Sequence, residues 1–215
     1  AKRLDEALEH YLVAIKEDSS VALFSPYNFT PKKILGFGAF GVTFLCDQFG
    51  APVAVKSISL NRALGDGEEV VRRLAQEWST LRMLRDPRVI NALNFDPNRQ
   101  PNGDLRPFLT MEYFEGHDLQ EYRDGHPERF GVDQLKHTLE VAREIALGLH
   151  AAHQRKIIHR DVKPANILYR RDDHGFEVKV IDFGLALPPQ QVRAQSMLAS
   201  SPLTSGAGSL LASSI

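Results

Sequence analysis

Apolar residues recur at helical spacing in three stretches of the chain, and this pattern predicts amphipathic helices over residues 3–18, 66–84 and 133–154. Asp66 is a candidate N-cap for the second helix. The predicted apolar stripes are Leu4, Leu8, Tyr11, Leu12 and Ile15 in the first helix, Val70, Val71, Leu74, Trp78, Leu81 and Leu84 in the second, and Leu135, Leu139, Ala142, Ala146 and Leu149 in the third.

Between these helices the pattern is typical of short strands separated by turn residues. The predicted strands cover residues 29–36, 42–47, 52–60, 89–95, 107–116, 167–169 and 178–181. Turn signals lie at Phe49–Gly50–Ala51, at Asn102–Gly103 and in the DDHG sequence of residues 172–175. The first five strands therefore precede a second, smaller strand pair.

Composition narrows the classes of partner that we expect. The 215 residues are 43% hydrophobic and 25% charged, with a net charge of −1 and a pI near 6.8. This balance is typical of a globular domain, and it gives no basic face for nucleic acid or an anionic membrane. The lone Cys46 excludes an internal disulfide and fits a reducing, cytoplasmic compartment. No apolar run approaches the roughly 20 residues of a membrane-spanning helix.

Residues 157–184 carry the densest candidate chemistry. They place Asp161, Lys163, Asn166 and Asp182 on loops beside the last two predicted strands. Two carboxylates, one carboxamide and one ammonium suit the binding of a metal-phosphate group and the acceptance of a proton from a hydroxyl.

These residues lie in HRDVKPAN and DFG, which resemble the catalytic and magnesium-binding loops of eukaryotic-type protein kinases. Upstream, GFGAFG and VAVK resemble the family's phosphate-covering loop and its phosphate-binding lysine strand. GxGxxG by itself also opens dinucleotide-binding helices, but here a strand follows it. The resemblance implies an α+β, bilobal fold whose N-lobe is a five-stranded antiparallel sheet with one long helix. It places the N-lobe and hinge at residues 27–114 and part of a mostly helical C-lobe at 115–215.

The resemblance also implies roles for individual residues. Asp161 would be the base, Lys163 would shield the γ-phosphate, and Asn166 and Asp182 would hold Mg²⁺. Lys56 would contact the ATP phosphates and pair with Glu77, whereas Glu68 and Glu69 fit the first turn of their helix as dipole partners. The implied nucleotide-binding residues, besides Lys56, are Leu35, Gly36, Gly38, Gly41, Thr43, Ala54, Met111, Glu112, Phe114, Asp118 and Leu168. Asp118 would accept from the ribose or act as a helix N-cap.

The implied activity is ATP-dependent phosphorylation of serine or threonine in protein substrates, because Lys163 lies in a VKPAN context. A nucleotide-binding scaffold without chemistry and a regulatory interaction module are the alternatives. Arg160 could pair with a phosphate on the following loop, where Ser200, Ser201, Thr204 and Ser205 are candidate sites in a segment that could equally stay unmodified.

Both chain ends carry expectations. The helix within residues 1–20 resembles the second helix of a tetratricopeptide repeat, but it could instead pack on the following domain or serve as a linker. The absence of an initiator Met suggests that the sequence was cut from something longer. Kinases continue beyond the position of Ile215, so we expect this chain alone to expose the apolar face of helix 133–154, to be marginally stable and to transfer phosphate poorly.

Overall fold

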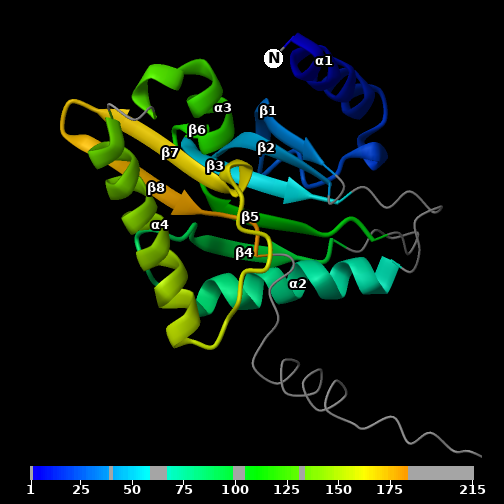
Figure 1. Cartoon of the computed structure of the whole chain (residues 1–215). Helices are drawn as coiled ribbons and strands as arrows, with labels where there is room; N and C mark the ends of the chain where they lie inside the picture. The colour runs from blue at the N-terminus through cyan, green and yellow to red at the C-terminus, as the bar shows by residue number, and fades with distance from the viewer. Residues whose placement is uncertain (1, 39–40, 59–66, 99–104, 131–133, 184–215) are drawn as a thin grey trace, which may run out of the picture.

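The structure is a computed structural model, and it describes residues 2–38, 41–58, 67–98, 105–130 and 134–183. The first part contains α1 (Lys2–Glu17), the 3-10 turn η1 (Ser19–Val21), β1 (Thr30–Gly38), β2 (Gly41–Gln48), β3 (Ala51–Ser57), α2 (Gly67–Met83), β4 (Ala92–Asp96) and β5 (Phe108–Glu112). The second contains β6 (His117–Asp118), α3 (Leu119–Gly125), η2 (Pro127–Arg129), α4 (Leu135–Gln154), η4 (Pro164–Asn166), β7 (Ile167–Asp172) and β8 (Gly175–Val180). Figure 1 shows both parts.

The larger sheet has five strands in the order β1-β2-β3-β5-β4, and every neighbouring pair is antiparallel. The hairpin between β2 and β3 turns at Phe49 and Gly50, whose φ values of 53° and 86° are both positive. Such a two-residue turn matches the twist of the flanking strands. The five-stranded antiparallel sheet predicted from the family resemblance is therefore confirmed.

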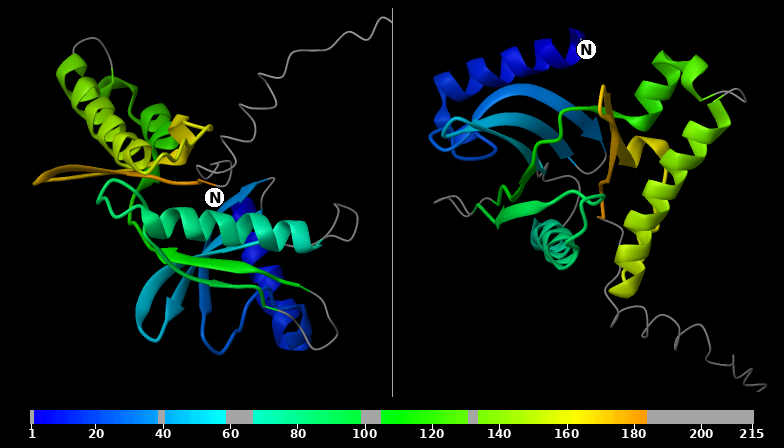
Figure 2. Two further views of the ribbon diagram at one scale, coloured as in Figure 1. Left: turned by 90° about the horizontal axis from the view of Figure 1, so that it is seen from below. Right: turned by 90° about the vertical axis from the view of Figure 1, so that its left-hand side faces the viewer.

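Helices cover both faces of this sheet (Figure 2). On one side α2 packs on β4 and β5, and its predicted stripe supplies Leu74, Leu81 and Leu84 to the core. Asp66, the predicted N-cap, and the Asn102–Gly103 turn lie outside the described residues. Burying the apolar stripe of α2 explains why this stretch is held as a helix against the sheet.

On the other side α1 packs on β1. Its residues Leu4, Leu8 and Tyr11 contact a cluster of buried aromatic and aliphatic residues of the sheet. The Tyr11 and Phe44 ring centroids are 5.2 Å apart, and the Tyr11 hydroxyl accepts from the Leu23 N–H at 3.0 Å. The stripe of α1 therefore faces the following domain. The expected membership in an upstream repeat stays a prediction.

The smaller sheet has the order β6-β7-β8, with β7 and β8 joined by the predicted DDHG turn. Helix α4 packs on β8 through Val141, Gly148 and Ala152, which are buried. The predicted stripe lies elsewhere on α4, and Leu135 and Leu139 remain 56% and 59% exposed. The expected exposure is therefore confirmed at Leu135 and Leu139, whereas Leu149 of the same stripe packs against the core. The contact with β8 uses positions that the periodicity did not single out.

The two parts meet where the segment after α2 reaches β8. Val89 forms an isolated parallel bridge with Val180, whose carbonyl accepts from the Ile90 N–H at 3.1 Å. This contact places the end of β8 and the loop after it beside the five-stranded sheet. Among the described helices, none is both long and apolar enough to cross a membrane.

Candidate active site

The first residue of β2, Gly41, lies close to the main chain of the neighbouring strand β3. Gly41 has a φ of 116°, and a Cβ added there would lie 2.2 Å from the Ser57 carbonyl oxygen. Only a residue without a side chain fits this position without displacing backbone. Gly38 ends β1, its surroundings are not described, and the loop residues 39–40 lie outside the described part of the chain.

An ion cluster joins β3, α2 and the loop after β8. Lys56 on β3 contacts both carboxylate oxygens of Glu77 on α2 at 2.9 Å and Asp182 Oδ1 at 3.0 Å. The Lys56 and Glu77 side chains are only 12% and 4% exposed. Burial opposes the charge on Lys56, but the carboxylates of Glu77 and Asp182 outweigh it and raise the pKa of Lys56. The lysine is therefore a cation held in a site that is largely closed to water.

Asp182, a member of this cluster, and Arg160, in the loop that precedes Asp161, have an uncommon backbone conformation. Asp182 and Arg160 have φ values of 64° and 71°, in the left-handed region that non-glycine residues rarely adopt. Such strain of the order of 1–3 kcal/mol persists only where the surrounding structure enforces it, and it concentrates at functional sites. The conformation turns the chain between His159 and Asp161, and again between Ile181 and Phe183.

Asp161 is held by its own loop. Its Oδ2 accepts from Lys163 Nζ at 2.7 Å and from Asn166 Nδ2 at 2.9 Å. The hydrogen bond from Lys163 lowers the pKa of Asp161, burial opposes this effect, and the hydrogen bond from Asn166 adds to the lowering. Asp161 is thus ionised at neutral pH, and it remains partly open to solvent, with its side chain 32% exposed.

Hydrogen bonds connect the loop of Asp161 to the loop of Asp182. The Ile181 N–H donates to the Asn166 carbonyl at 3.0 Å, and His159 Nε2 lies 2.9 Å from the Ile181 carbonyl. The His159 and Phe183 ring centroids are 4.5 Å apart, and both residues are buried. These two residues therefore pack together and fix the loop geometry.

A cavity of about 390 Å³, which we call the central cavity, opens between the larger sheet and β7. Twelve of the predicted site residues line it: Leu35, Gly36, Thr43, Ala54, Lys56, Glu77, Met111, Glu112, Phe114, Asp118, Leu168 and Asp182. Its walls are mainly apolar where Ala54 and Leu168 contribute, and charged at the end that contains Lys56 and Asp182. This combination suits a flat ring joined to an anionic chain.

Some predicted residues are not in the lining. Gly38, Gly41, Asp161, Lys163 and Asn166 do not line the central cavity, although the last three form the adjoining loop. Asp118 both lines the cavity and caps α3, since its Oδ1 accepts from the Glu121 N–H at 2.8 Å. The helix-cap interpretation is therefore correct, and the ribose contact stays a prediction.

The sequence reasoning missed several lining residues. These are Lys33, Ile90, Tyr113, Gly116, His117, Glu121, Ala165 and Ile181. Ala165 and Ile181 lie within or next to the motifs, so their proximity was a usable signal. Ile90 enters the cavity through the pairing of its segment with β8, which no local pattern reveals.

Comparison with known proteins agrees with this geometry. A family model described as the protein kinase domain matches residues 29–204. The chain belongs to the protein kinase domain family. The kinase-like α+β fold expected from the sequence is thereby confirmed, and residues 1–28, which contain α1, precede the matched region.

Individual relatives show the same similarity. The chain is 34% identical over 161 residues to U-box domain-containing protein 34 of Arabidopsis thaliana, which covers 74% of this chain and 18% of that protein. It is 32% identical over 165 residues to the probable serine/threonine-protein kinase kinX of Dictyostelium discoideum, with 76% and 14% covered. It is 30% identical over 156 residues to serine/threonine-protein kinase PrkC of Bacillus subtilis, with 72% and 22% covered. The matched part of this chain thus spans about a fifth or less of the length of these relatives.

Proposed function

We propose that this kinase domain binds Mg-ATP in the central cavity and transfers its γ-phosphoryl group to serine or threonine hydroxyls of protein substrates. The observation that carries the proposal is the ion cluster of Lys56, Glu77 and Asp182 at one end of the cavity, beside the loop that holds Asp161. Two of the relatives are named as serine/threonine-protein kinases, which supports the same class of acceptor.

The residues fit the substrate ATP. Ala54 and Leu168 offer apolar contact from opposite walls to an adenine ring, and the backbone at Glu112 and Phe114 offers polar groups to its edge. The Glu112 side chain is engaged elsewhere, because its Oε1 accepts from Lys179 Nζ at 2.7 Å. A main-chain role for Glu112 is therefore consistent with its contacts.

The residues also fit one or more magnesium ions. Asn166 and Asp182 offer hard oxygen ligands, and Asp182 also lines the central cavity. No group of three or more His, Cys, Asp or Glu within the described ranges could form a metal site by itself. Mg²⁺ typically completes its coordination with water and phosphate oxygens, and when bound it would neutralise charge that develops on the phosphates.

The protein's own part in the reaction follows from its geometry. Lys56, fixed by Glu77, would place a cation against the phosphates. Asp161 would orient the acceptor hydroxyl and take its proton at Oδ2, while Lys163 would shift from Asp161 towards the transferred group. Such positioning and charge stabilisation supply most of the rate enhancement in phosphoryl transfer.

Binding and chemistry can be tested separately. Mg-ATP should raise the free energy of unfolding by about 2.7 kcal/mol at a hundredfold excess over Kd, measured by thermal denaturation. Lys56→Met should reduce this gain relative to its own ligand-free stability. Asp161→Asn should keep the gain but abolish transfer of radiolabelled phosphate to a mixed serine/threonine peptide, whereas the exposed Asp5→Asn serves as the control.

Unchanged transfer by Asp161→Asn would refute the assignment of the base. A tyrosine-only peptide that is labelled as well as the serine/threonine peptide would refute the acceptor class.

A second function, nucleotide binding without transfer, has one observation in its favour. Leu135 and Leu139 on α4, the helix that leads to the catalytic loop, are exposed, so no part of the chain that the structure describes covers this side of the helix. A loosely supported catalytic loop would bind nucleotide but transfer poorly. Stabilisation by Mg-ATP together with no labelling of peptide by the wild-type chain would identify this case.

A further inference from the structure

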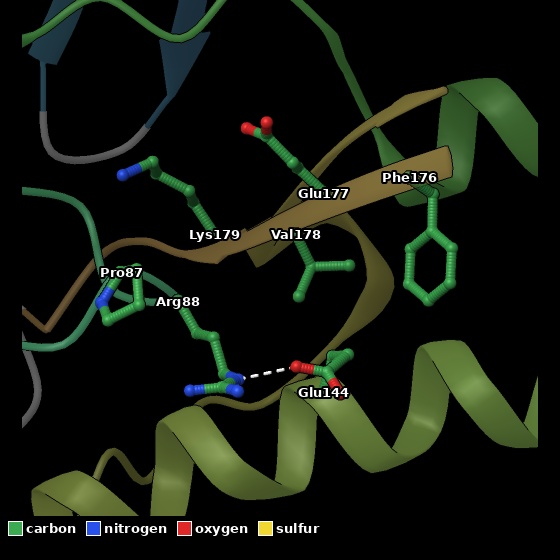
Figure 3. Close-up of a pocket in the computed structure, with 7 residues that line it drawn as sticks. All are labelled: Pro87, Arg88, Glu144, Phe176, Glu177, Val178 and Lys179. Atoms are coloured by element: carbon green, nitrogen blue, oxygen red, sulfur yellow. Dashed lines mark hydrogen bonds and ion pairs between the residues drawn. The ribbon is translucent and has the colours of Figure 1, made fainter. Parts of the chain in front are cut away.

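A second cavity of about 540 Å³ lies beside β8, and we call it the β8 groove (Figure 3). It shares no lining residue with the central cavity. Its walls are Pro87, Arg88, Glu144 and the four consecutive residues Phe176, Glu177, Val178 and Lys179. Side chains of consecutive strand residues point to opposite faces of a sheet, so a cavity that touches all four runs along the edge of the strand.

β8 is the terminal strand of its sheet, and its main-chain groups show which way the open edge faces. The Val180 N–H donates to the Arg88 carbonyl at 2.7 Å, and the Val180 carbonyl accepts from the Ile90 N–H. Val180 therefore directs its main-chain groups away from β7. In an antiparallel pair this direction alternates, so Val178 and Phe176, two and four residues earlier, direct theirs the same way.

The outward main-chain groups of Phe176 and Val178 are unpaired within the described part of the chain, since they face away from β7 and form no hydrogen bond with any other described segment. Only the last residue of the edge, Val180, is covered by the segment around Val89. The open stretch is thus continuous with an edge that already accepts one strand-like segment.

The charged side chains of the groove are satisfied by protein partners. Arg88 Nε pairs with Glu144 Oε2 at 2.5 Å, as Figure 3 shows. Lys179 pairs with Glu112 at 2.7 Å, and Glu177 pairs with Arg170 at 2.8 Å. A ligand recognised mainly by its charge would have to break these pairs. The unpaired main-chain groups of the groove can bind a ligand without breaking any of these ion pairs.

The groove also has fixed walls. α4 approaches the Arg88 segment so closely that a Cβ added at Gly148 would lie 3.0 Å from the Arg88 Cβ and 3.3 Å from its carbonyl oxygen. The bridge of Val89 with Val180 holds the same segment from the other side. A preformed edge lowers the entropic cost of adding a strand.

We propose that the β8 groove binds an extended segment of a partner protein, which adds to the open edge of β8 as a further strand. The N–H and C=O groups of Phe176 and Val178 would form up to four hydrogen bonds with its backbone. Figure 3 shows Val178 and Phe176 towards α4 and Glu177 and Lys179 on the opposite side of β8. The segment would therefore alternate apolar residues, on the α4 side, with polar residues. This site is separate from the nucleotide site and does not depend on the proposed catalysis.

Val178→Pro is the sharpest test, because proline removes one outward N–H and is tolerated on a strand edge. Val178→Thr is the matched control, since it keeps both the N–H and a β-branched side chain. The probe is a positional-scanning library of eight-residue capped peptides, from which the tightest binder is remade with a fluorescent label. Fluorescence polarisation should show binding about tenfold weaker to Val178→Pro, the value of one main-chain hydrogen bond, and unchanged binding to Val178→Thr.

A second measurement does not depend on how the variant folds. Two N-methylated forms of the selected peptide have the same side chains but carry the methyl groups on opposite sets of alternate amides. Only the form whose methylated amides face β8 should lose binding to the wild-type protein. Equal binding by Val178→Pro and wild type, indifference to N-methylation, or a library without any binder would overturn the proposal. Concentration-dependent dimerisation that Val178→Pro removes would also overturn it, by assigning the edge to a second copy of the chain.

Discussion

Replacing Lys56 with methionine would leave Glu77 buried without its cation. The Glu77 side chain is 4% exposed and contacts Lys56 through both oxygens. It must then either keep an unpaired charge in the core or take up a proton. For a carboxyl group with the ordinary pKa of 4.5, protonation at pH 7 costs about 3 kcal/mol. Protonation of Glu77 therefore limits the loss of stability to about 3 kcal/mol. This value lies near the lower end of the range for breaking a buried ion pair.

The same reasoning fixes the sign of the pH dependence. Burial raises the pKa of Glu77, and Lys56→Met removes the main influence that opposes this effect, leaving only the smaller one of His159. A carboxyl group with a raised pKa in the folded state binds more protons than in the unfolded state, so the variant loses stability as pH rises. We expect the cost of Lys56→Met to grow by about 1.4 kcal/mol per pH unit between about pH 5 and the raised pKa of Glu77.

Urea denaturation at several pH values measures this directly, because the single tryptophan, Trp78, neighbours Glu77 on α2 and reports unfolding by fluorescence. Adding Glu77→Gln to Lys56→Met should remove the pH dependence, and the exposed Lys16→Met is the control. If Lys56→Met stayed within about 0.5 kcal/mol of the wild type at every pH, the pair would not be a buried one and our reasoning would fail.

Three further predictions concern the packing. Burial raises the pKa of the Cys46 thiol to about 12. Iodoacetamide at neutral pH should therefore modify Cys46 only in urea, as measured by mass spectrometry. Modification of the native chain would contradict this burial. Gly148→Ala should lower the free energy of unfolding by about 1–3 kcal/mol in thermal denaturation, because its Cβ would crowd Arg88. This loss is expected although alanine favours a helix more than glycine does. An increase in the free energy of unfolding would show that α4 can shift. Tyr11→Phe should cost about 1 kcal/mol and Tyr11→Ala clearly more, whereas Leu12→Ala at the surface should cost little; equal effects would mean that α1 is not docked.

Local sequence carried much of the fold. The β2–β3 hairpin needed only alternating residues around Phe49 and Gly50, and α2 needed only a stripe with helical period. The buried side of α4 was harder to predict, because this helix has apolar residues on more than one side. Periodicity finds such a helix but does not tell which side meets β8.

The candidate site divides in the same way. Lys56, Glu77, Asp161 and Asp182 were identified because their motifs stand in one order along the chain. Their contacts within 3.0 Å bring together β3, α2 and the loop after β8. The entry of Ile90 into the cavity follows from a bridge between two residues that are 91 positions apart in sequence, Val89 and Val180.

The sequence by itself determined the family, the helices and strands, and the residue types available for chemistry, because these depend on local periodicity and on motifs within a few residues. Only the tertiary structure decided that α1 packs on the sheet and which stripe of α4 is buried. It also decided that no other described segment covers the edge of β8 at Phe176 and Val178. Those outcomes depend on which surfaces meet, and burial is a property of the folded neighbourhood that a linear pattern does not contain.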